Sequence, residues 1–263
     1  MPIAVTREVS PGIDRCELTH LSRQPIDLVT ARAQHAAYEQ CLREAGCAVV
    51  RLPSDASLPD SVFVEDVAVV FDEFAVMMRP GVPSRRAETS AIAGAIRAFR
   101  PLRYIEPPGT IDGGDVLVIG KRVVIGRSGR TNDAAISQME RLLAPIGYLV
   151  QSVRVQGCLH LKSAVTAVSE DTLLVNRSWV MGGGFSSFTM IDVDSAEPFG
   201  ANALRVGNRV IYPTRFSGTR RRLEDRGVHV IGVDVGELAK AEGGVTCCSL
   251  ILSVGNDVRG ASR

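Results

Sequence analysis

The sequence predicts an α/β protein in which five repeats close into a ring, with residues 1–263 forming one domain. Three observations support this. A unit of about fifty residues recurs along the chain, and repeats of this length are typical of solenoids, propellers and closed arrays. The two ends of the chain supply complementary parts of one unit, which would close the ring. The reactive side chains fall at corresponding positions of successive units.

The clearest unit begins near Gly109 and reads strand, turn, strand, junction, helix, strand. Its strands are expected at 111–119, 123–126 and 148–153, and its helix at 132–143. Ile136, Met139 and Leu143 recur at the spacing of one helical face, and Pro145 and Gly147 end that helix. The preceding unit has the same pattern, with strands at 61–70, 74–78 and 102–106 and a helix from 86 to 99.

The other three units are looser. In the unit 160–193, a glycine-rich piece at 181–188 stands where a helix would be. The unit 200–235 has strands near 204, at 210–212 and at 228–233, with a helix at 219–226. The fifth unit combines a strand at 247–254 with a strand at 3–9, a helix at 30–45 and a strand at 48–52.

Composition excludes several classes of protein. The net charge of +1 favours neither nucleic acid nor a membrane surface as a partner. The most apolar stretch, 62–78, is interrupted by four acidic residues, and the N-terminus lacks the regions of a signal peptide. We therefore expect a cytoplasmic protein with reduced cysteines. None of the six cysteines makes a Cys-x-x-Cys pair, so no structural metal and no cofactor are expected.

Five equivalent positions start the units: Asp66, Asp112, His160, Asn202 and Cys247. They lie 46, 48, 42 and 45 residues apart by subtraction of their numbers. In a ring of such units the first strands lie near the axis, so these side chains would converge on one central site. Two adjacent cysteines in an apolar strand are more often simply buried. The register with the other reactive residues favours a functional Cys247.

The residue types fit one chemistry. A cysteine near a histidine is a nucleophile with a proton carrier. Carboxylates that converge on one pocket repel one another unless they bracket a cation, and a planar guanidinium suits them best through paired hydrogen bonds. The residues therefore predict attack by a thiolate on a guanidinium-type carbon.

Six segments resemble the dimethylarginine dimethylaminohydrolase family, in order and at compatible spacing. They include Val-Glu-Asp-Val at 64–67, Asp-Gly-Gly-Asp at 112–115, Leu-His-Leu-Lys-Ser at 159–163 and Thr-Cys-Cys-Ser at 246–249, with further matches at 79–86 and 128–132. The resemblance covers nearly the whole chain. It implies the five-bladed α/β-propeller (pentein) of the guanidino-modifying superfamily, with pseudo-fivefold ββαβ repeats around a central active site.

The resemblance also implies roles for individual residues. Cys247 would be the nucleophile, His160 the general acid and base, and Asp112 would hold the reacting guanidino nitrogens. The substrate would be a small guanidino amino acid, an Nω-methylated arginine cleaved to citrulline and an amine. Phe63 lies two residues before Glu65, and from this spacing we expect it on the apolar side of the pocket, near the N-methyl groups. The predicted substrate-binding residues are Leu18, Asp60, Phe63, Glu65, Asp66, Arg85, Arg130 and Ala241.

Other assignments and alternatives remain open at this stage. Asp115 is expected to cap backbone in the Gly-Gly turn, and the remaining cysteines are expected in the core. The chain could instead resemble an arginine or agmatine deiminase or an amidinotransferase in activity, or be a non-catalytic propeller that binds a ligand. Zinc held by Cys247, Cys248 and His160 would act as an inhibitor. A homodimer is compatible with the sequence, which does not decide the oligomeric state.

Overall fold

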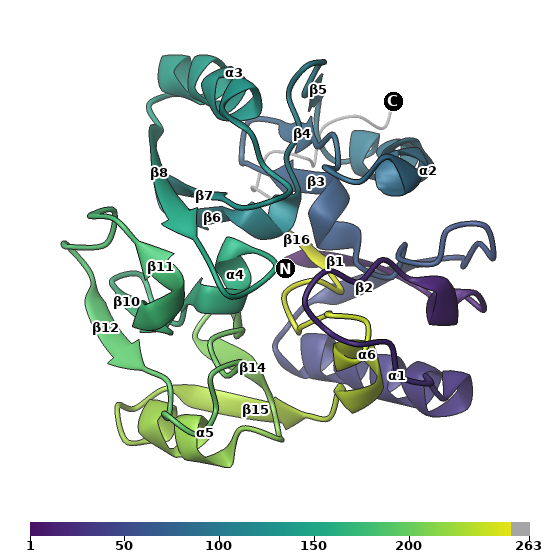
Figure 1. Ribbon diagram of the computed structural model, residues 1–263, viewed down its shortest axis with the longest axis vertical. Helices are drawn as coiled ribbons and strands as arrows, with labels where there is room; N and C mark the ends of the chain where they lie inside the picture. Colours follow the sequence, from purple (N-terminus) through teal and green to yellow (C-terminus); the bar gives the residue numbers. More distant parts are fainter. Residues whose placement is uncertain (254–263) are drawn as a thin grey trace.

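Five small sheets surround a common centre in the computed structural model, which describes residues 1–253 (Figure 1). Each sheet repeats one pattern, in which the middle strand pairs antiparallel with the first strand and parallel with the third. Four sheets follow one another along the chain: β3 (Ala68–Val70), β4 (Ala75–Met77), β5 (Leu102–Tyr104); β6 (Val116–Ile119), β7 (Arg122–Arg127), β8 (Leu149–Val155); β9 (Val165–Ala167), β10 (Thr172–Val175), β12 (Thr189–Asp192); β13 (Leu204–Val206), β14 (Arg209–Pro213), β15 (His229–Val233).

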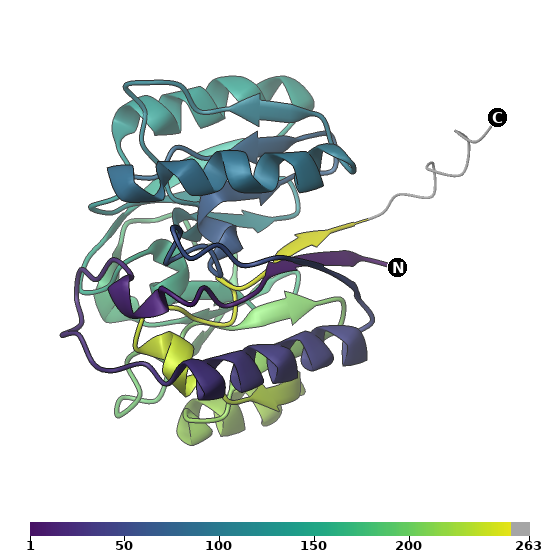
Figure 2. The ribbon, with the colours of Figure 1, turned by 90° about the vertical axis from the view of Figure 1, so that its right-hand side faces the viewer.

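The fifth sheet joins the two ends of the chain, as predicted. It consists of β16 (Leu250–Leu252), β1 (Ile3–Arg7) and β2 (Ala48–Leu52), with Val5 opposite Leu250. Figure 2 shows β1 and β16 side by side. The predicted strand 247–254 is shorter than expected at its start, and Val254 lies outside the described residues.

Four helices cover the outside of the ring: α1 (Leu28–Glu44), α2 (Arg86–Arg97), α3 (Asp133–Leu143) and α5 (Ser217–Glu224) (Figure 1). Side-chain caps fix two of their starts, since Asp27 accepts a hydrogen bond from the Thr30 amide and Asn132 accepts one from the Ala135 amide. The unit 160–193 has no long helix, as its glycine-rich piece at 181–188 predicts. Strand β11 (Val180–Met181) instead joins the neighbouring sheet beside β8. A short helix that we did not expect, α6 (Gly236–Ala239), precedes the glycines at 243 and 244.

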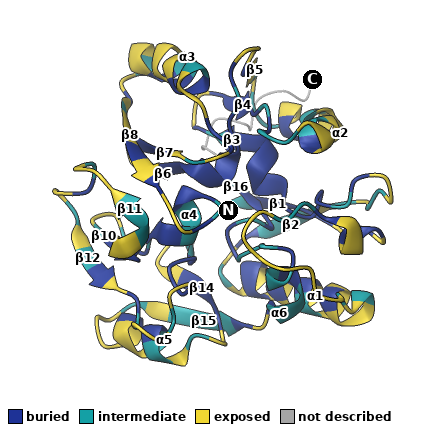
Figure 3. Cartoon of the chain, viewed as in Figure 1, coloured by how far each residue is buried: buried dark blue, intermediate teal, exposed yellow. Residues whose placement is uncertain are grey.

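The apolar core is divided among the spaces between sheets and helices. The α3 face predicted from sequence, Ile136, Met139 and Leu143, packs with Val123 and Ile125 of β7. Figure 3 shows this division, with buried strands toward the centre and exposed helix faces outside. The repeats therefore act as a scaffold that fixes the ends of the inner strands.

The inner strands begin later than the sequence predicts. Short helical turns come first in three units: η2 (Val64–Val67), η4 (Gly113–Asp115) and α4 (Leu161–Ala164). A turn at 245–248 stands before β16 in the same way. The prediction of continuous strands through these segments was wrong. Acidic residues and glycines interrupt the apolar pattern of the first two segments, and lysine, serine or threonine interrupts it in the others. A helical turn of this kind presents side chains and unpaired amides together.

No helix among residues 1–253 is long and apolar enough to cross a membrane.

A buried polar cluster lies between α1 and the sheet formed by β16, β1 and β2. Glu39 is fully buried and accepts hydrogen bonds from Thr6 and Arg51, and His35 lies beside it with its Nδ1 atom 3.8 Å from Oε1. Within the described chain, His35 Nε2 has no hydrogen-bond partner.

Burial lowers the pKa of His35 to about 4, although Glu39 opposes the shift. The unfolded chain therefore takes up a proton at higher pH than the folded chain does. We expect the free energy of unfolding to fall as the pH falls from about 6.5 to 4, by up to about 3 kcal/mol from this group. Urea denaturation of the wild type and of His35→Leu across this range would measure the difference. A variant of the exposed His229, His229→Gln, serves as the control, and an unchanged slope in His35→Leu would contradict the assignment.

Candidate active site

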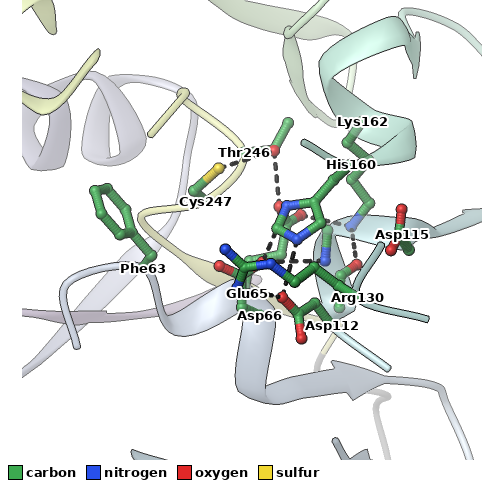
Figure 4. A network of polar contacts seen from close by, with 12 residues as sticks. Phe63, Glu65, Asp66, Asp112, Asp115, Arg130, His160, Lys162, Thr246 and Cys247 are labelled. Atoms are coloured by element: carbon green, nitrogen blue, oxygen red, sulfur yellow. Dashed lines mark hydrogen bonds and ion pairs between the residues drawn. The ribbon is translucent and has the colours of Figure 1, made fainter. Parts of the chain in front are cut away.

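Side chains from the turns before the inner strands meet at one end of the ring (Figure 4). Glu65 and Asp66 come from η2, Asp112 precedes η4, His160 precedes α4, and Cys247 lies in the turn before β16. The structure thus brings together the four reactive positions that the repeat predicts. The fifth position, Asn202, binds the same region through hydrogen bonds with the Thr246 amide and hydroxyl.

His160 is buried between two carboxylates. Its Nε2 atom lies 3.0 Å from Asp112 Oδ2, and its Nδ1 atom lies 3.7 Å from Asp66 Oδ1. Burial alone would lower the pKa of His160, but the charge of Asp66, the hydrogen bond that His160 donates to Asp112 and the charges of Asp115 and Asp112 raise it to about 9. The imidazole is therefore a cation at neutral pH and is ready to donate a proton.

Gly114 explains how these groups come so close. A Cβ atom at this position would lie 2.5 Å from His160 Nδ1 and 2.9 Å from Asp66 Oδ1, so a larger residue would collide with both. The Gly114 amide also donates a hydrogen bond of 3.2 Å to Asp66 Oδ1. The glycine of the Asp-Gly-Gly-Asp motif is needed here for close approach.

Glu65 is held by a network that the sequence analysis did not assign. Its Oε1 atom accepts a hydrogen bond of 2.6 Å from Lys162 Nζ, and its Oε2 atom accepts one of 2.7 Å from the Thr246 hydroxyl. Lys162 lies two residues after His160, and Thr246 directly precedes Cys247, so both belong to the motifs of the predicted site. Their positions beside His160 and Cys247 were the available signal, since a buried carboxylate needs such partners.

Asp66 is paired with a buried arginine. Arg85 Nη1 donates a hydrogen bond of 2.7 Å to Asp66 Oδ2, and Arg85 Nη2 donates one of 2.8 Å to Glu88. Burial works against ionisation of Asp66, yet the charges of His160 and Arg85 keep the pKa of this carboxyl below its ordinary value. Arg85 thus supports the site from inside, and its predicted contact with a substrate carboxylate stays a prediction.

The predicted amino-acid end of the site is covered by residues 17–21. Asp60 is buried and accepts hydrogen bonds of 3.2 Å from the Glu17 amide. Arg130 Nη2 donates a hydrogen bond of 2.8 Å to the Thr19 hydroxyl, while its Nη1 atom lies 3.6 Å from Asp112 Oδ2. Leu18, between these two contacts, packs against the neighbouring core cluster.

Cys247 lies between the Phe63 ring and the His160 imidazole in the view of Figure 4. Its sulfur accepts a hydrogen bond of 3.3 Å from the Gly244 amide. Burial and the charges of Glu65 and Asp66 raise the pKa of the Cys247 thiol to about 12. Cys248 is fully buried, as predicted for a packed neighbour. Both cysteines lie in a turn and not in the strand that the sequence predicts at 247–254.

The space between these groups is nearly closed. A cavity of about 10 Å³ is bordered by Asp60, Asp66, Arg130, His160 and Cys247, together with Phe63, Arg85 and Ala241. A second cavity of about 430 Å³ shares Leu159, Glu242, Gly243 and Cys247 with it. Phe63 fills the place of a side chain at position 243, where a Cβ atom would lie 2.1 Å from its ring.

Contrary to the prediction, the Asp115 side chain does not cap its own Gly-Gly turn but binds groups of other segments. It accepts hydrogen bonds from the hydroxyls of Ser128 and Thr131 and one of 2.9 Å from the Leu161 amide. It therefore fixes the start of α4, directly after His160. Burial raises the pKa of Asp115 to about 6.

The zinc alternative has no ready ligand set in the described part of the chain. Among residues 1–253, no group of three or more His, Cys, Asp or Glu side chains is arranged to hold a metal ion. Cys16, Cys41, Cys47 and Cys158 are buried free thiols, as expected.

Comparison with known proteins decides the family. The sequence model of the arginine deiminase family matches residues 56–199. Dimethylarginine dimethylaminohydrolase of Pseudomonas aeruginosa is 36% identical over 90% of this chain and 94% of its own length. The enzyme of that name from Streptomyces coelicolor is 37% identical over 95% of this chain and 96% of its own. The chain belongs to the dimethylarginine dimethylaminohydrolase family.

Solved structures agree with this assignment. A cysteine-to-serine variant of the dimethylarginine dimethylaminohydrolase from Pseudomonas aeruginosa, in complex with citrulline, has a TM-score of 0.90 at 33% identity, over 95% of this chain and 98% of that one. The N-terminal domain of ArgZ has a TM-score of 0.86 at 17% identity and supports the fold alone. The five-bladed propeller predicted from the repeats and the family resemblance is confirmed.

The ion pairs of Arg85 with Asp66 and Glu88 should contribute strongly to the stability of the folded protein. Replacing Arg85 with methionine would leave Glu88 buried without its cation and Asp66 with His160 alone. We expect a loss of about 3–5 kcal/mol in the free energy of unfolding, measured by urea denaturation. Arg220→Met is the matched control, because its pair with Glu224 is exposed and should contribute less than about 1 kcal/mol. Equal effects of the two substitutions would contradict this account.

Proposed function

We propose that the chain hydrolyses Nω-methylated arginines to citrulline and methylamine or dimethylamine, through a covalent intermediate on Cys247. The observation that carries the proposal is the distribution of charge around Cys247. Glu65 and Asp66 place negative charge near the thiol, and Asp112 lies against His160. Asp60 and Arg130 border the same small space as Cys247. A guanidino amino acid has the complementary pattern, with a cationic head and a zwitterionic tail.

In the first half of the reaction, the Cys247 thiolate forms a bond to the guanidinium carbon. His160, which is a cation at neutral pH, donates its proton to the departing amine. The carbon–nitrogen bond breaks and a thiouronium remains on the sulfur. Asp112 lies within hydrogen-bond distance of His160, so it can hold both the imidazole and a guanidino nitrogen.

In the second half, the now neutral His160 takes a proton from water, and the water oxygen attacks the thiouronium carbon. The carbon–sulfur bond breaks, citrulline leaves and the thiol is restored. One water molecule is consumed for each amine released. His160 therefore loses its proton in the first half and regains one in the second half.

The high pKa of the Cys247 thiol is compatible with its role. The same carboxylates that raise this pKa, Glu65 and Asp66, would bracket the substrate guanidinium. A bound cation cancels their charge and favours the thiolate. The nucleophile is thus formed where a cationic substrate is present, which protects the thiol from other electrophiles.

The roles proposed for the amino-acid end follow the charges. Asp60 would take the α-amino group and Arg130 and Arg85 the α-carboxylate, while Leu18 and Ala241 would contribute backbone contacts. Phe63 would border the N-methyl groups. We further propose that the chain works as a single domain, and a homodimer remains compatible with it.

A product assay tests the function. With mono- or dimethylated arginine we expect citrulline and the corresponding amine in equal amounts, and with free arginine little ammonia. Cys247→Ser should abolish turnover, whereas Cys248→Ser, at a buried neighbour, is the matched control. Ammonia from arginine without amine from the methylated substrates would favour a deiminase. Full activity of Cys247→Ser would contradict the nucleophile assignment.

Alkylation tests how the thiolate forms. Because the Cys247 pKa is about 12, reaction with neutral iodoacetamide should be slow at pH 7 and rise about tenfold per pH unit toward pH 10. The cationic 2-chloroacetamidine should react at least about tenfold faster relative to its rate with a small free thiol, and Glu65→Gln should reduce that advantage. Intact-mass measurements would follow both reactions. A reactivity ratio equal to that of a small thiol would contradict the mechanism.

A further inference from the structure

The segment 17–21, which covers the candidate site, is tied down by one carboxylate from the other end of the chain. Glu242 accepts three hydrogen bonds from successive backbone amides, those of Thr19 at 3.0 Å, His20 at 2.5 Å and Leu21 at 2.6 Å. Thr19 and His20 are exposed, so local packing does little to hold them. The three amides converge on Glu242 as they would on a bound anion.

The backbone at Glu242 adopts an unusual conformation. Its φ angle is 59°, and it is the one non-glycine residue with a positive φ in the described range 1–253. Glycine would adopt this conformation more easily. A glutamate at this position therefore destabilises the local backbone. Its side chain compensates through hydrogen bonds with the covering segment. Outliers of this kind often accompany function.

The covering segment has further contacts: the Ser84 hydroxyl donates a hydrogen bond to the Glu17 carboxylate, and two other side chains that bind the segment also have a different role. Asp60 binds the Glu17 amide and Arg130 binds the Thr19 hydroxyl. The proposed function assigns both side chains to the amino-acid end of the substrate. Substrate would therefore compete with the segment for them, whereas Glu242 would stay available to it.

The space beneath the segment must also widen to hold a substrate. The enclosed space of about 10 Å³ is at the lower limit for one water molecule and far too small for an arginine derivative. Glu17 and Glu242 both border it. The second cavity, of about 430 Å³, reaches Cys247 beside Glu242 and the end of segment 17–21. Glu242 is two residues from Gly244, whose amide contacts Cys247.

We propose that Glu242 is a positioning residue that fastens segment 17–21 over the amino-acid end of the bound substrate. It acts through the segment and not on the reacting atoms. Its loss should weaken substrate binding and leave the chemical step nearly unchanged. The expected change in KM rests on the proposed function. The expected loosening of segment 17–21 does not depend on it.

Glu242→Gly is the variant of choice, because glycine suits the positive φ and so preserves the local backbone. Glu242→Gln is the conservative variant, since it retains one acceptor oxygen. Glu197→Ala is the matched control: Glu197 also accepts hydrogen bonds from two successive amides, those of Gly218 and Thr219, far along the chain from this site. Hydrogen exchange by mass spectrometry and steady-state kinetics with dimethylarginine are measured on the full chain.

In Glu242→Gly we expect amide exchange in peptides covering 17–25 to accelerate at least about tenfold, with KM raised about tenfold and kcat within about threefold of wild type. Glu242→Gln should fall between, and Glu197→Ala should change neither quantity. Wild-type exchange in both Glu242 variants would overturn the proposal, and so would faster exchange with an unchanged KM. If Glu242→Gly does not fold, Glu242→Gln decides by the same two measurements. Absence of any turnover by the wild type would refute the proposed function, while the exchange comparison would still decide whether Glu242 holds the segment.

Discussion

The structure depends on the burial of several carboxylates at one end of the ring. Asp66, Asp112 and Asp115 are almost completely removed from water, and Glu65 is nearly so. Isolated buried carboxylates are too costly to stay ionised, so each needs a cation or hydrogen-bond donors. Lys162, Arg85 and His160 provide the cations. The same balance that makes folding possible leaves a pocket suited to a cationic substrate.

The fold supplies these partners from distant parts of the chain. Glu65 and Lys162 are 97 residues apart, and Glu65 and Thr246 are 181 apart. The five sheets are separate, and each fixes the end of one inner strand near the axis. A short turn before each inner strand then places one or two reactive side chains. This arrangement lets a site with many charges be assembled from local units that are each simple.

Proton states in the site follow from its surroundings. His160 gains affinity for a proton from the carboxylates around it, and the Cys247 thiol is kept neutral by burial and by the same charges. A protonated imidazole and a neutral thiol are thus present in the same site. A guanidinium that enters between the carboxylates would favour ionisation of the Cys247 thiol and would leave His160 protonated. The covering segment 17–21 lies over the same space through its hydrogen bonds with Asp60 and Arg130.

The sequence by itself determined the repeat, the closure of the ring by the two termini and the identity of the central reactive residues. It could do so because apolar periodicity and repeat spacing are local properties, and because the position of a side chain in a unit fixes its place near the axis. It did not determine the helical turns that replace the strand starts, or the partners Lys162, Thr246 and Glu88. Nor did it single out Glu242, whose carboxylate meets amides more than 220 residues away. Those features depend on which charges the tertiary structure brings together in a space without water, and no spacing in the sequence records that.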